Sequence, residues 1–423
     1  MAVRDLDVVV FGATGVTGRR VAAYLSERAG DTGLRWAAAA RDPEKLTATL
    51  GAIGVSAPET LVADVADPAS LSAMASRTRV VLDLVGPYTL YGRPVIAACV
   101  ANGAHYADLT GEMPFVRSII DEFHRPACDA GVKVVQVCGF EALPPDLMVA
   151  LAAEHARERW GGEELTSVDL DVAFAAPPGL PRPSDGMSGG TFQSLSVVAG
   201  GEDAARITDP ALLITDPAVA AAVRRASPIT LAPRRGPGGA VLAPMAPAAF
   251  INPAVIHRTA ALAAAADGRA AAPFAYREGM LLGGSAATLP ARWLAAGALA
   301  STQAGLRALA RARPAIRRPF ASAMGRLGPS SGFGPAADRL EGWSWSMSAH
   351  ARTAGGRKVE VNLSADGHPG YLATARLFGE AGILLSRDGE TPPNAGCLTP
   401  AAALGTACVA QFEHARLRFS VAD

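Results

Sequence analysis

The feature that most constrains the fold of this chain is a glycine-rich turn between an apolar strand and a helix. Residues Val8 to Phe11 are strongly apolar and run directly into a Gly-x-x-Gly-x-x-Gly spacing. In such a turn the first glycine permits the tight reversal, the second lets the backbone approach a pyrophosphate, and the third allows the helix to pack closely on the strand. The following helix presents free N–H groups and partial positive charge to phosphates. The motif predicts a Rossmann domain whose dinucleotide contacts come from Gly12, Ala13, Thr14, Gly15, Val16, Thr17 and Gly18.

The segment from residue 6 to residue 138 alternates short apolar runs with amphipathic stretches, the pattern of a parallel sheet built from βαβ units. Crossover helices are expected between the strands, for example over Thr17–Arg28, Asp67–Ser76 and Arg93–Asn102. The sequence therefore predicts an α/β fold with a complete doubly wound sheet. Its expected strands are Leu6–Phe11, Leu34–Ala39, Thr60–Ala63, Val80–Leu84, His105–Ala107 and Val132–Val137.

The remainder of the chain predicts a second domain of mixed α and β structure. A helix over Pro145–Trp160 leads away from the first sheet, and alternating residues Thr166–Ala175 open a new strand. Residues 280–327 are rich in alanine and leucine but are interrupted by proline and arginine, so no run is long enough to span a bilayer. Weak peripheral contact with a membrane stays open. Further elements are expected at Gly342–His350, Lys358–Leu363, Tyr371–Leu385, after Pro400 and near Arg416–Val421.

Charge and cysteine content exclude several classes of protein. The chain has 423 residues, and its 39 lysines and arginines balance 39 acidic residues, so no global field attracts nucleic acid. The five cysteines are widely spaced and include no Cys-x-x-Cys pair, and the seven histidines lack metal-ligand spacing, so no metal site is expected. The N-terminus lacks the apolar core and cleavage site of a signal peptide. We therefore expect a cytoplasmic protein.

The residues at the end of the second predicted strand indicate which of the two nicotinamide dinucleotides, NAD(H) or NADP(H), the domain binds. NAD-binding proteins usually place an acid there to bind the ribose diol, whereas this chain has Arg41 followed by Asp42, with Lys45 nearby. A guanidinium can bind a 2′-phosphate and stack on adenine, which favours NADP(H). Two alternatives stay open, namely that Arg41 and Lys45 are solvated loop charges and that Asp42 turns toward a ribose. Asp64 is placed to bond the adenine or to cap the next helix.

The segments after the fourth, fifth and sixth strands supply the candidate catalytic residues, because ligands bind at the carboxyl ends of parallel strands. Gly86 and Pro87 are expected to border the nicotinamide ribose, together with Tyr88. A tyrosine phenol or a carboxylic acid in this cleft can donate a proton to a substrate, although such residues are more often only packing or capping residues. Tyr88 is the first candidate, and the full set is Tyr88, Tyr91, Glu112 and Glu141.

Several motifs together resemble the saccharopine dehydrogenase-like oxidoreductases. They are the glycine turn, Gly86-Pro87-Tyr88 with Tyr91-Gly92, His105-Tyr106-Ala107-Asp108-Leu109-Thr110-Gly111-Glu112, Gly139-Phe140-Glu141 with Pro144 and Asp146, Ser188-Gly189-Gly190-Thr191, Gly367-His368-Pro369-Gly370-Tyr371 with Thr374, and Leu398-Thr399-Pro400-Ala401. The chain departs from the family at Glu141-Ala142, where an aspartate and a serine are usual. The resemblance implies a Rossmann domain over residues 1–145, a substrate domain over 146–395, and a helix and strand over 396–423 that return to the first domain.

Within that family the chain is most similar to the trans-acting enoyl reductases, which act in secondary metabolism on chains held by a partner polyketide synthase. The resemblance implies an NADPH-dependent reductase of a carbon–carbon double bond in an acyl thioester. Two alternatives stay open: a dehydrogenase acting on C–N bonds, as the wider family name suggests, and a non-catalytic NADP-binding subunit. A carboxylate-rich substrate would need converging arginines, for which Arg182, Arg206, Arg224 and Arg225 are available.

Overall fold

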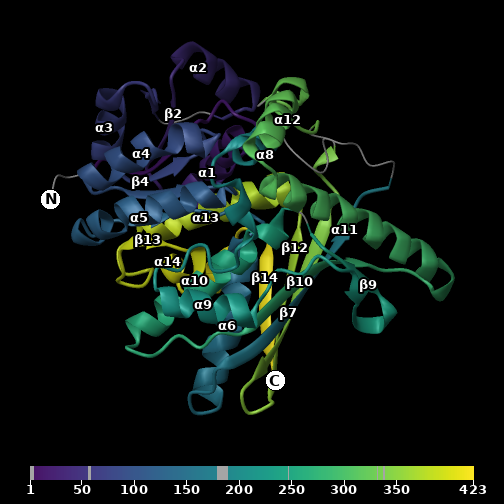
Figure 1. Ribbon diagram of the computed structural model, residues 1–423. Helices are drawn as coiled ribbons and strands as arrows, with labels where there is room; N and C mark the ends of the chain where they lie inside the picture. Colours follow the sequence, from purple (N-terminus) through teal and green to yellow (C-terminus); the bar gives the residue numbers. More distant parts are fainter. Residues whose placement is uncertain (1–3, 56–58, 179–188, 246, 331, 337–338) are drawn as a thin grey trace.

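Two seven-stranded sheets form the framework of the protein. The computed structural model describes residues 4–423 apart from 56–58, 179–188, 246, 331 and 337–338. In Figure 1 the N-terminal elements, drawn in purple and blue, gather at one end of the molecule, and the strands of the second sheet lie beneath them. The first sheet positions the candidate site, and the second sheet carries the elements that face it.

The first sheet is entirely parallel and has the order β13-β6-β5-β4-β1-β2-β3. The chain order reverses between β1 and β4, so the connections on the two sides leave a crevice at the carboxyl ends of these strands. The strands are β1 (Leu6–Phe11), β2 (Trp36–Ala40), β3 (Thr60–Val62), β4 (Thr78–Asp83), β5 (His105–Asp108), β6 (Lys133–Val135) and β13 (Gly396–Leu398).

Helices cover both faces of the first sheet because its strands are apolar on both sides. Val8 and Val10 of β1 point into one core, whereas Val9 and Phe11 point into the other. Helices α3, α4 and α5 pack on the second of these cores, and α1, α2, α6 and α13 contribute to the first. Their bounds are α1 (Gly18–Thr32), α2 (Pro43–Ala52), α3 (Pro68–Arg77), α4 (Tyr88–Asn102), α5 (Met113–Asp129), α6 (Leu143–Arg159) and α13 (Thr374–Ser386).

The second sheet has the order β14-β12-β11-β7-β10-β9-β8 and is antiparallel except for the β7–β10 pair. Alternate residues of β11, such as Trp345 and Met347, join the core that also holds Leu147 of α6. That core therefore joins the two sheets. The strands are β7 (Leu165–Ala175), β8 (Arg234–Arg235), β9 (Val241–Ala243), β10 (Ala275–Leu282), β11 (Ser344–Thr353), β12 (Lys358–Asp366) and β14 (Leu417–Ala422).

The remaining helical elements connect the strands of the second sheet and the C-terminal segment, and three of them, α8, η1 and η3, close the far side of the site. In the ranges that the structure describes, every helix is too short or too polar to cross a bilayer. These elements are α8 (Gly189–Gly200), η1 (Ala204–Thr208), α9 (Pro217–Ala226), η2 (Pro237–Gly239), η3 (Ala248–Phe250), α10 (Asn252–Ala266), η4 (Ala286–Thr288), α11 (Leu289–Arg311), α12 (Pro314–Leu327), the π-helix η6 (Pro369–Ala373), α14 (Pro400–Leu404) and η7 (Thr406–Glu413).

The predicted fold class is confirmed, but the path of the C-terminal segment is not the expected one. The helix after Pro400 does lie near the first sheet, next to β13, which the sequence did not reveal as a strand. The expectation that the final strand returns there was wrong, because β14 pairs with β12 in the second sheet. In Figure 1 the yellow β13 lies beside α5, whereas β14 lies among the strands of the second sheet. Division at residues 145 and 395 stays a prediction.

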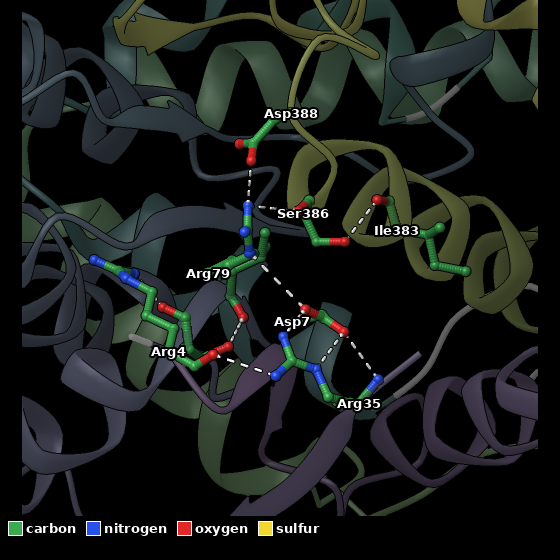
Figure 2. Close-up of polar contacts among 9 residues, drawn as sticks. Arg4, Asp7, Arg35, Arg79, Ile383, Ser386 and Asp388 are labelled. Carbon is green, nitrogen blue, oxygen red and sulfur yellow. Dashed lines mark hydrogen bonds and ion pairs between the residues drawn. The ribbon is translucent and has the colours of Figure 1, made fainter. Parts of the chain in front are cut away.

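Helix α13 ties the C-terminal part of the chain back to the start of the first sheet. Figure 2 shows its C-terminal end beside the N-terminal ends of β1, β2 and β4. Arg79 donates to the carboxylate of Asp388 at 2.9 Å, and it lies 3.9 Å from Asp7. Asp7 in turn pairs with Arg35 at 2.7 Å. These exposed pairs mark where α13 ends and contribute little stability.

A buried carboxylate on α13 makes a stronger connection to α1. Glu380 is fully buried and accepts hydrogen bonds from the Tyr24 hydroxyl at 2.5 Å, the Arg28 Nε at 2.6 Å and the Gln411 amide at 2.7 Å. The guanidinium of Arg28 is itself buried. Glu380 therefore fixes α13 against the helix that follows the glycine turn.

We predict that Glu380→Ala lowers the free energy of unfolding by about 3–5 kcal/mol, because it removes the buried partner of the Arg28 charge and leaves only the exposed Asp31 at 3.5 Å. Urea denaturation followed by circular dichroism measures this loss. Asp388→Ala is the matched control, since Asp388 belongs to an exposed pair and its removal should leave the urea midpoint almost unchanged. Equal midpoints for the two variants would contradict the structural role given to Glu380.

Candidate functional site

A cavity of about 700 Å³ lies along the carboxyl edge of the first sheet. The loops that follow β1 to β6 form one side, and residues of α8, η1 and η3 form the other. Its size is within the range of known ligand pockets. Among the predicted cofactor-binding residues, those in the cavity wall are Gly12, Thr14, Gly15, Val16, Thr17, Gly18, Arg41, Lys45, Asp64, Gly86 and Tyr88; Ala13 is buried beneath it and Pro87 precedes α4 outside the wall.

The glycine turn has the geometry of a phosphate cradle. Gly12 has a φ of 90°, which disfavours any residue with a side chain. A Cβ atom on Gly18 would overlap the carbonyl oxygen of Gly12, so α1 can begin this close to β1 only with glycine there. The N–H groups of Thr14, Val16, Thr17 and Gly18 have no acceptor among the described residues. These groups at the start of α1 fit a pyrophosphate.

The residues after β2 form the end of the cavity where an adenosine would lie. Arg41 is exposed and makes no hydrogen bond or ion pair with a described residue, so its guanidinium is free for a ligand. Asp42 caps α2 instead, accepting from the backbone N–H of Lys45 at 2.9 Å. The ribose role that the sequence left open for Asp42 therefore competes with a capping role. Asp64 accepts from Ala66 N–H within its own loop, and Asp67 caps α3.

Tyr88 lies in the cavity wall with its hydroxyl already engaged. The phenol donates to the backbone carbonyl of Asp83 at 3.2 Å and accepts from the N–H of Leu109 at 3.4 Å. Burial raises the pKa of Tyr88 well above its usual value, with Asp108 and Asp83 adding to the effect. The side chain thus braces two loops, and its role as proton donor stays a prediction. Tyr91 is 39% exposed in the same wall, and its hydroxyl has no described partner.

Glu112 is held as a hydrogen-bond acceptor at the start of α4. Its carboxylate accepts from the N–H groups of Tyr88 at 2.9 Å and Thr89 at 2.8 Å, and from the Thr89 hydroxyl. It also accepts from the Ser194 hydroxyl at 2.7 Å, which connects it to α8. All four partners donate to this carboxylate as the structure has it, and its role as a catalytic group stays a prediction. It fixes α4 and α8 around the cavity.

Glu141 is the predicted residue whose surroundings suit an acid. It lies in the cavity wall just after β6 and makes no hydrogen bond to another described residue. Burial raises the pKa of its carboxyl group, which favours the neutral, proton-donating form. Asp146, by contrast, lies outside the cavity, where it accepts from Thr259 and from the N–H of Ala401. Glu141 therefore combines access to the cavity with a carboxyl that makes no hydrogen bond to any other described residue.

The sequence did not identify the wall opposite the sheet. Helix α8 begins in close contact with the Ser330 carbonyl oxygen, which a Cβ atom on Gly189 would overlap. The Gly189-Gly190 pair was therefore the sequence feature that could have indicated this wall. Val137 was missed as well; it is a β-branched residue with a φ of 64°, and no local pattern predicts it. Ser188 and Arg182 lie outside the described residues. The missed wall residues are Thr191, Ser194, Leu195, Val198, Ile207, Pro247, Phe250 and Ile251.

Comparison with known proteins agrees with this geometry. The sequence family described as the saccharopine dehydrogenase NADP binding domain matches residues 8–135. A Mycobacterium tuberculosis protein provisionally named a trans-acting enoyl reductase is 37% identical over 422 residues, covering 96% of this chain and 94% of its own. A Mycobacterium ulcerans protein named trans-acting enoyl reductase is 34% identical, with coverage of 97% and 96%. The chain belongs to the trans-acting enoyl reductase family.

Membership of the trans-acting enoyl reductases confirms the resemblance predicted from the motifs. Saccharopine dehydrogenase from Saccharomyces cerevisiae shares the fold, with a TM-score of 0.53, 14% identity and coverage of 99% of this chain and 100% of that one. The protein is an oxidoreductase, and its cofactor is NADP(H). Which residues bind the cofactor stays a prediction, for which the free N–H groups of the glycine turn and the unpaired Arg41 give the physical basis. In the described ranges no group of three or more acidic, histidine or cysteine side chains could hold a metal ion.

We predict that Arg41→Ala weakens NADPH binding by about tenfold or more, since it removes a charged hydrogen bond of about 1.5–3 kcal/mol to the 2′-phosphate. NADH lacks that phosphate, so its affinity should stay nearly unchanged. Fluorescence titration with both dinucleotides measures the two dissociation constants. Arg125→Ala, an exposed arginine on α5 away from the cavity, is the matched control. Equal losses for NADPH and NADH would defeat the assignment.

Proposed function

We propose that the protein reduces the carbon–carbon double bond of an α,β-unsaturated acyl thioester at the expense of NADPH. The observation that carries the proposal is the contrast between the two sides of one cavity. The sheet edge offers free N–H groups and Arg41, whereas the opposite wall is largely apolar. An apolar wall favours an acyl chain over a substrate with several charges. This wall contains Leu195, Val198, Ile207, Pro247, Phe250 and Ile251.

The protein's own groups have two tasks in this reaction. Bound NADPH supplies a hydride for the β-carbon of the thioester. The resulting enolate then needs a hydrogen bond to its oxygen and a proton at its α-carbon. We assign the proton donor to Glu141, because burial favours its neutral form and its carboxyl lines the cavity without a hydrogen bond to another described residue. The phenol of Tyr91, in the same wall, is the second candidate, and the hydroxyl of Tyr88 would first have to release its backbone contacts.

The rival reaction on C–N bonds finds less support in the cavity. A substrate with several carboxylates needs converging guanidinium groups. Among the described residues that line the cavity, Arg41 is the arginine present, and it lies at the dinucleotide end. Arg206 and Arg224 instead pair with Asp203 and Asp209, and they lie outside the cavity wall, as does Arg225. Arg182 is outside the described residues.

The substrate is proposed to arrive attached to another protein. The names of the relatives describe trans-acting enzymes, so we propose a polyketide synthase as the chain-bearing partner of this protein. The acyl chain would lie against the apolar wall, and its thioester would reach the residues after β6. A cytoplasmic location, predicted from the sequence, belongs to the same proposal.

The decisive experiment follows NADPH absorbance with the purified protein and two substrate types. Crotonyl-pantetheine represents an enoyl thioester, and a 2-oxo acid with an amino acid represents imine chemistry. We expect saturable NADPH consumption with the thioester alone. NADPH consumption with the oxo acid and amine, but not with the thioester, would show that the protein acts on C–N bonds instead. NADPH binding without consumption in either assay would favour a non-catalytic subunit.

We predict that Glu141→Gln lowers turnover by about 100-fold while NADPH affinity is preserved, because the amide cannot donate a proton of the required acidity. In the unmodified protein, turnover should fall as pH rises through the elevated pKa of Glu141, since the donor must be protonated, and the variant should lack this fall. Tyr88→Phe and Tyr91→Phe are matched comparisons in the same wall. Full activity of Glu141→Gln with a 100-fold loss in either tyrosine variant would move the role to that tyrosine.

A further inference from the structure

Three fully buried side chains meet directly beneath the cavity. Asp83 ends β4 and Asp108 ends β5, and the two residues are register partners on neighbouring strands. The hydroxyl of Tyr106, two residues before Asp108, lies 3.0 Å from Oδ2 of Asp83 and 3.0 Å from Oδ2 of Asp108. One phenol therefore bridges two carboxyl groups at the edge of the sheet.

The other oxygen of each carboxyl group fixes the loops that follow the strands. Oδ1 of Asp83 accepts from the N–H of Val85 at 2.9 Å. Oδ1 of Asp108 accepts from the N–H groups of Thr110 at 3.0 Å and Val137 at 3.1 Å. Val85, Thr110 and Val137 all line the cavity, each in a different loop. The three side chains thus connect the loops after β4, β5 and β6.

The loop after β6 depends most on this arrangement. Val137 adopts a φ of 64°, which is unfavourable for a β-branched residue. Such a conformation persists only where surrounding contacts hold it. Asp108 provides two of them, because its carboxylate accepts the Val137 N–H and its backbone carbonyl accepts the N–H of Cys138 at 2.9 Å.

The hydrogen-bond donors are distributed unequally between the two carboxyl groups. Asp108 has four donors around it: two backbone N–H groups, Tyr106, and the Gln136 amide at 3.4 Å. Asp83 has the Val85 N–H and shares Tyr106. Neither carboxyl forms an ion pair with a described residue. Two buried carboxylates without a cation repel each other, so one of them retains a proton.

We propose that Asp83 is held as a neutral acid that donates to Tyr106, that Tyr106 donates in turn to an ionised Asp108, and that this chain positions the three cavity loops for NADPH. Burial raises the pKa of Asp83 to about 8, and it raises that of Asp108 only to about 6 because more donors surround it. Tyr106 and Asp108 act as positioning residues. These positioning roles are the same whether the enzyme reduces a C=C or a C=N bond, because they act on cofactor binding.

The test compares two isosteric substitutions. In Asp83→Asn the amide can still donate to Tyr106, so the NADPH dissociation constant should stay within about twofold of the unmodified protein. In Asp108→Asn the amide cannot accept from all four donors, and the dissociation constant should rise about tenfold or more. Difference infrared spectroscopy at neutral pH should show a protonated-carboxyl band that Asp83→Asn removes. Asp146→Asn, a buried acid outside the cavity, is the control and should leave NADPH affinity unchanged.

Several results would overturn the proposal. A larger loss of NADPH affinity in Asp83→Asn than in Asp108→Asn would make Asp83 the anion. A folded Asp108→Asn protein with unchanged affinity would show that the loops do not depend on this chain of hydrogen bonds. If Asp108→Asn does not fold, Tyr106→Phe replaces it, because it removes only the bridging hydroxyl. A folded Tyr106→Phe protein with unchanged NADPH affinity would likewise refute the positioning role.

Discussion

The close approach of α1 to β1 is the constraint on which the site depends. Because Gly18 has no Cβ atom, which would overlap the Gly12 carbonyl oxygen, α1 can begin in close contact with the end of β1. The free N–H groups of the turn then lie at the edge of the sheet. This placement sets where a pyrophosphate can lie, and the parallel order of the strands sets the rest. In the proposed binding mode the adenosine extends toward β2 and Arg41, and the nicotinamide extends toward the loops after β4, β5 and β6.

Elements with local signals were predictable from the sequence. The strand Leu6–Phe11 was located without error because its apolar run is bounded by polar residues and by the glycine turn. The short β13 was not found, since three residues between a loop and Pro400 carry too little periodicity. The final strand was found, but its partner was not, because alternation predicts a strand and says nothing about which edge receives it.

In the candidate site, too, local signals were predictable from the sequence and tertiary contacts were not. Position after a strand predicted correctly that Glu112, Glu141 and Tyr88 would surround one cavity, since the carboxyl ends of parallel strands converge. Hydrogen bonds from other segments of the chain give these three residues different roles. Ser194 on α8 donates to the carboxylate of Glu112, and the N–H of Leu109 donates to the hydroxyl of Tyr88. No spacing in the sequence encodes such contacts. Residue type and position thus identified candidates, and tertiary partners distinguish what each can do.

The late position of β13 in the chain has a consequence for synthesis of the protein. During translation β6 remains an open edge until residues 396–398 have left the ribosome, and most of the chain is made in that interval. Open parallel edges invite pairing between nascent chains. Lys133 lies on this edge, and its ammonium group is enclosed only when Thr391, Pro392 and Ala403 arrive to accept its hydrogen bonds. A solvated charge at an open edge disfavours pairing with another chain, and in the folded protein the same ammonium group binds the returning segment.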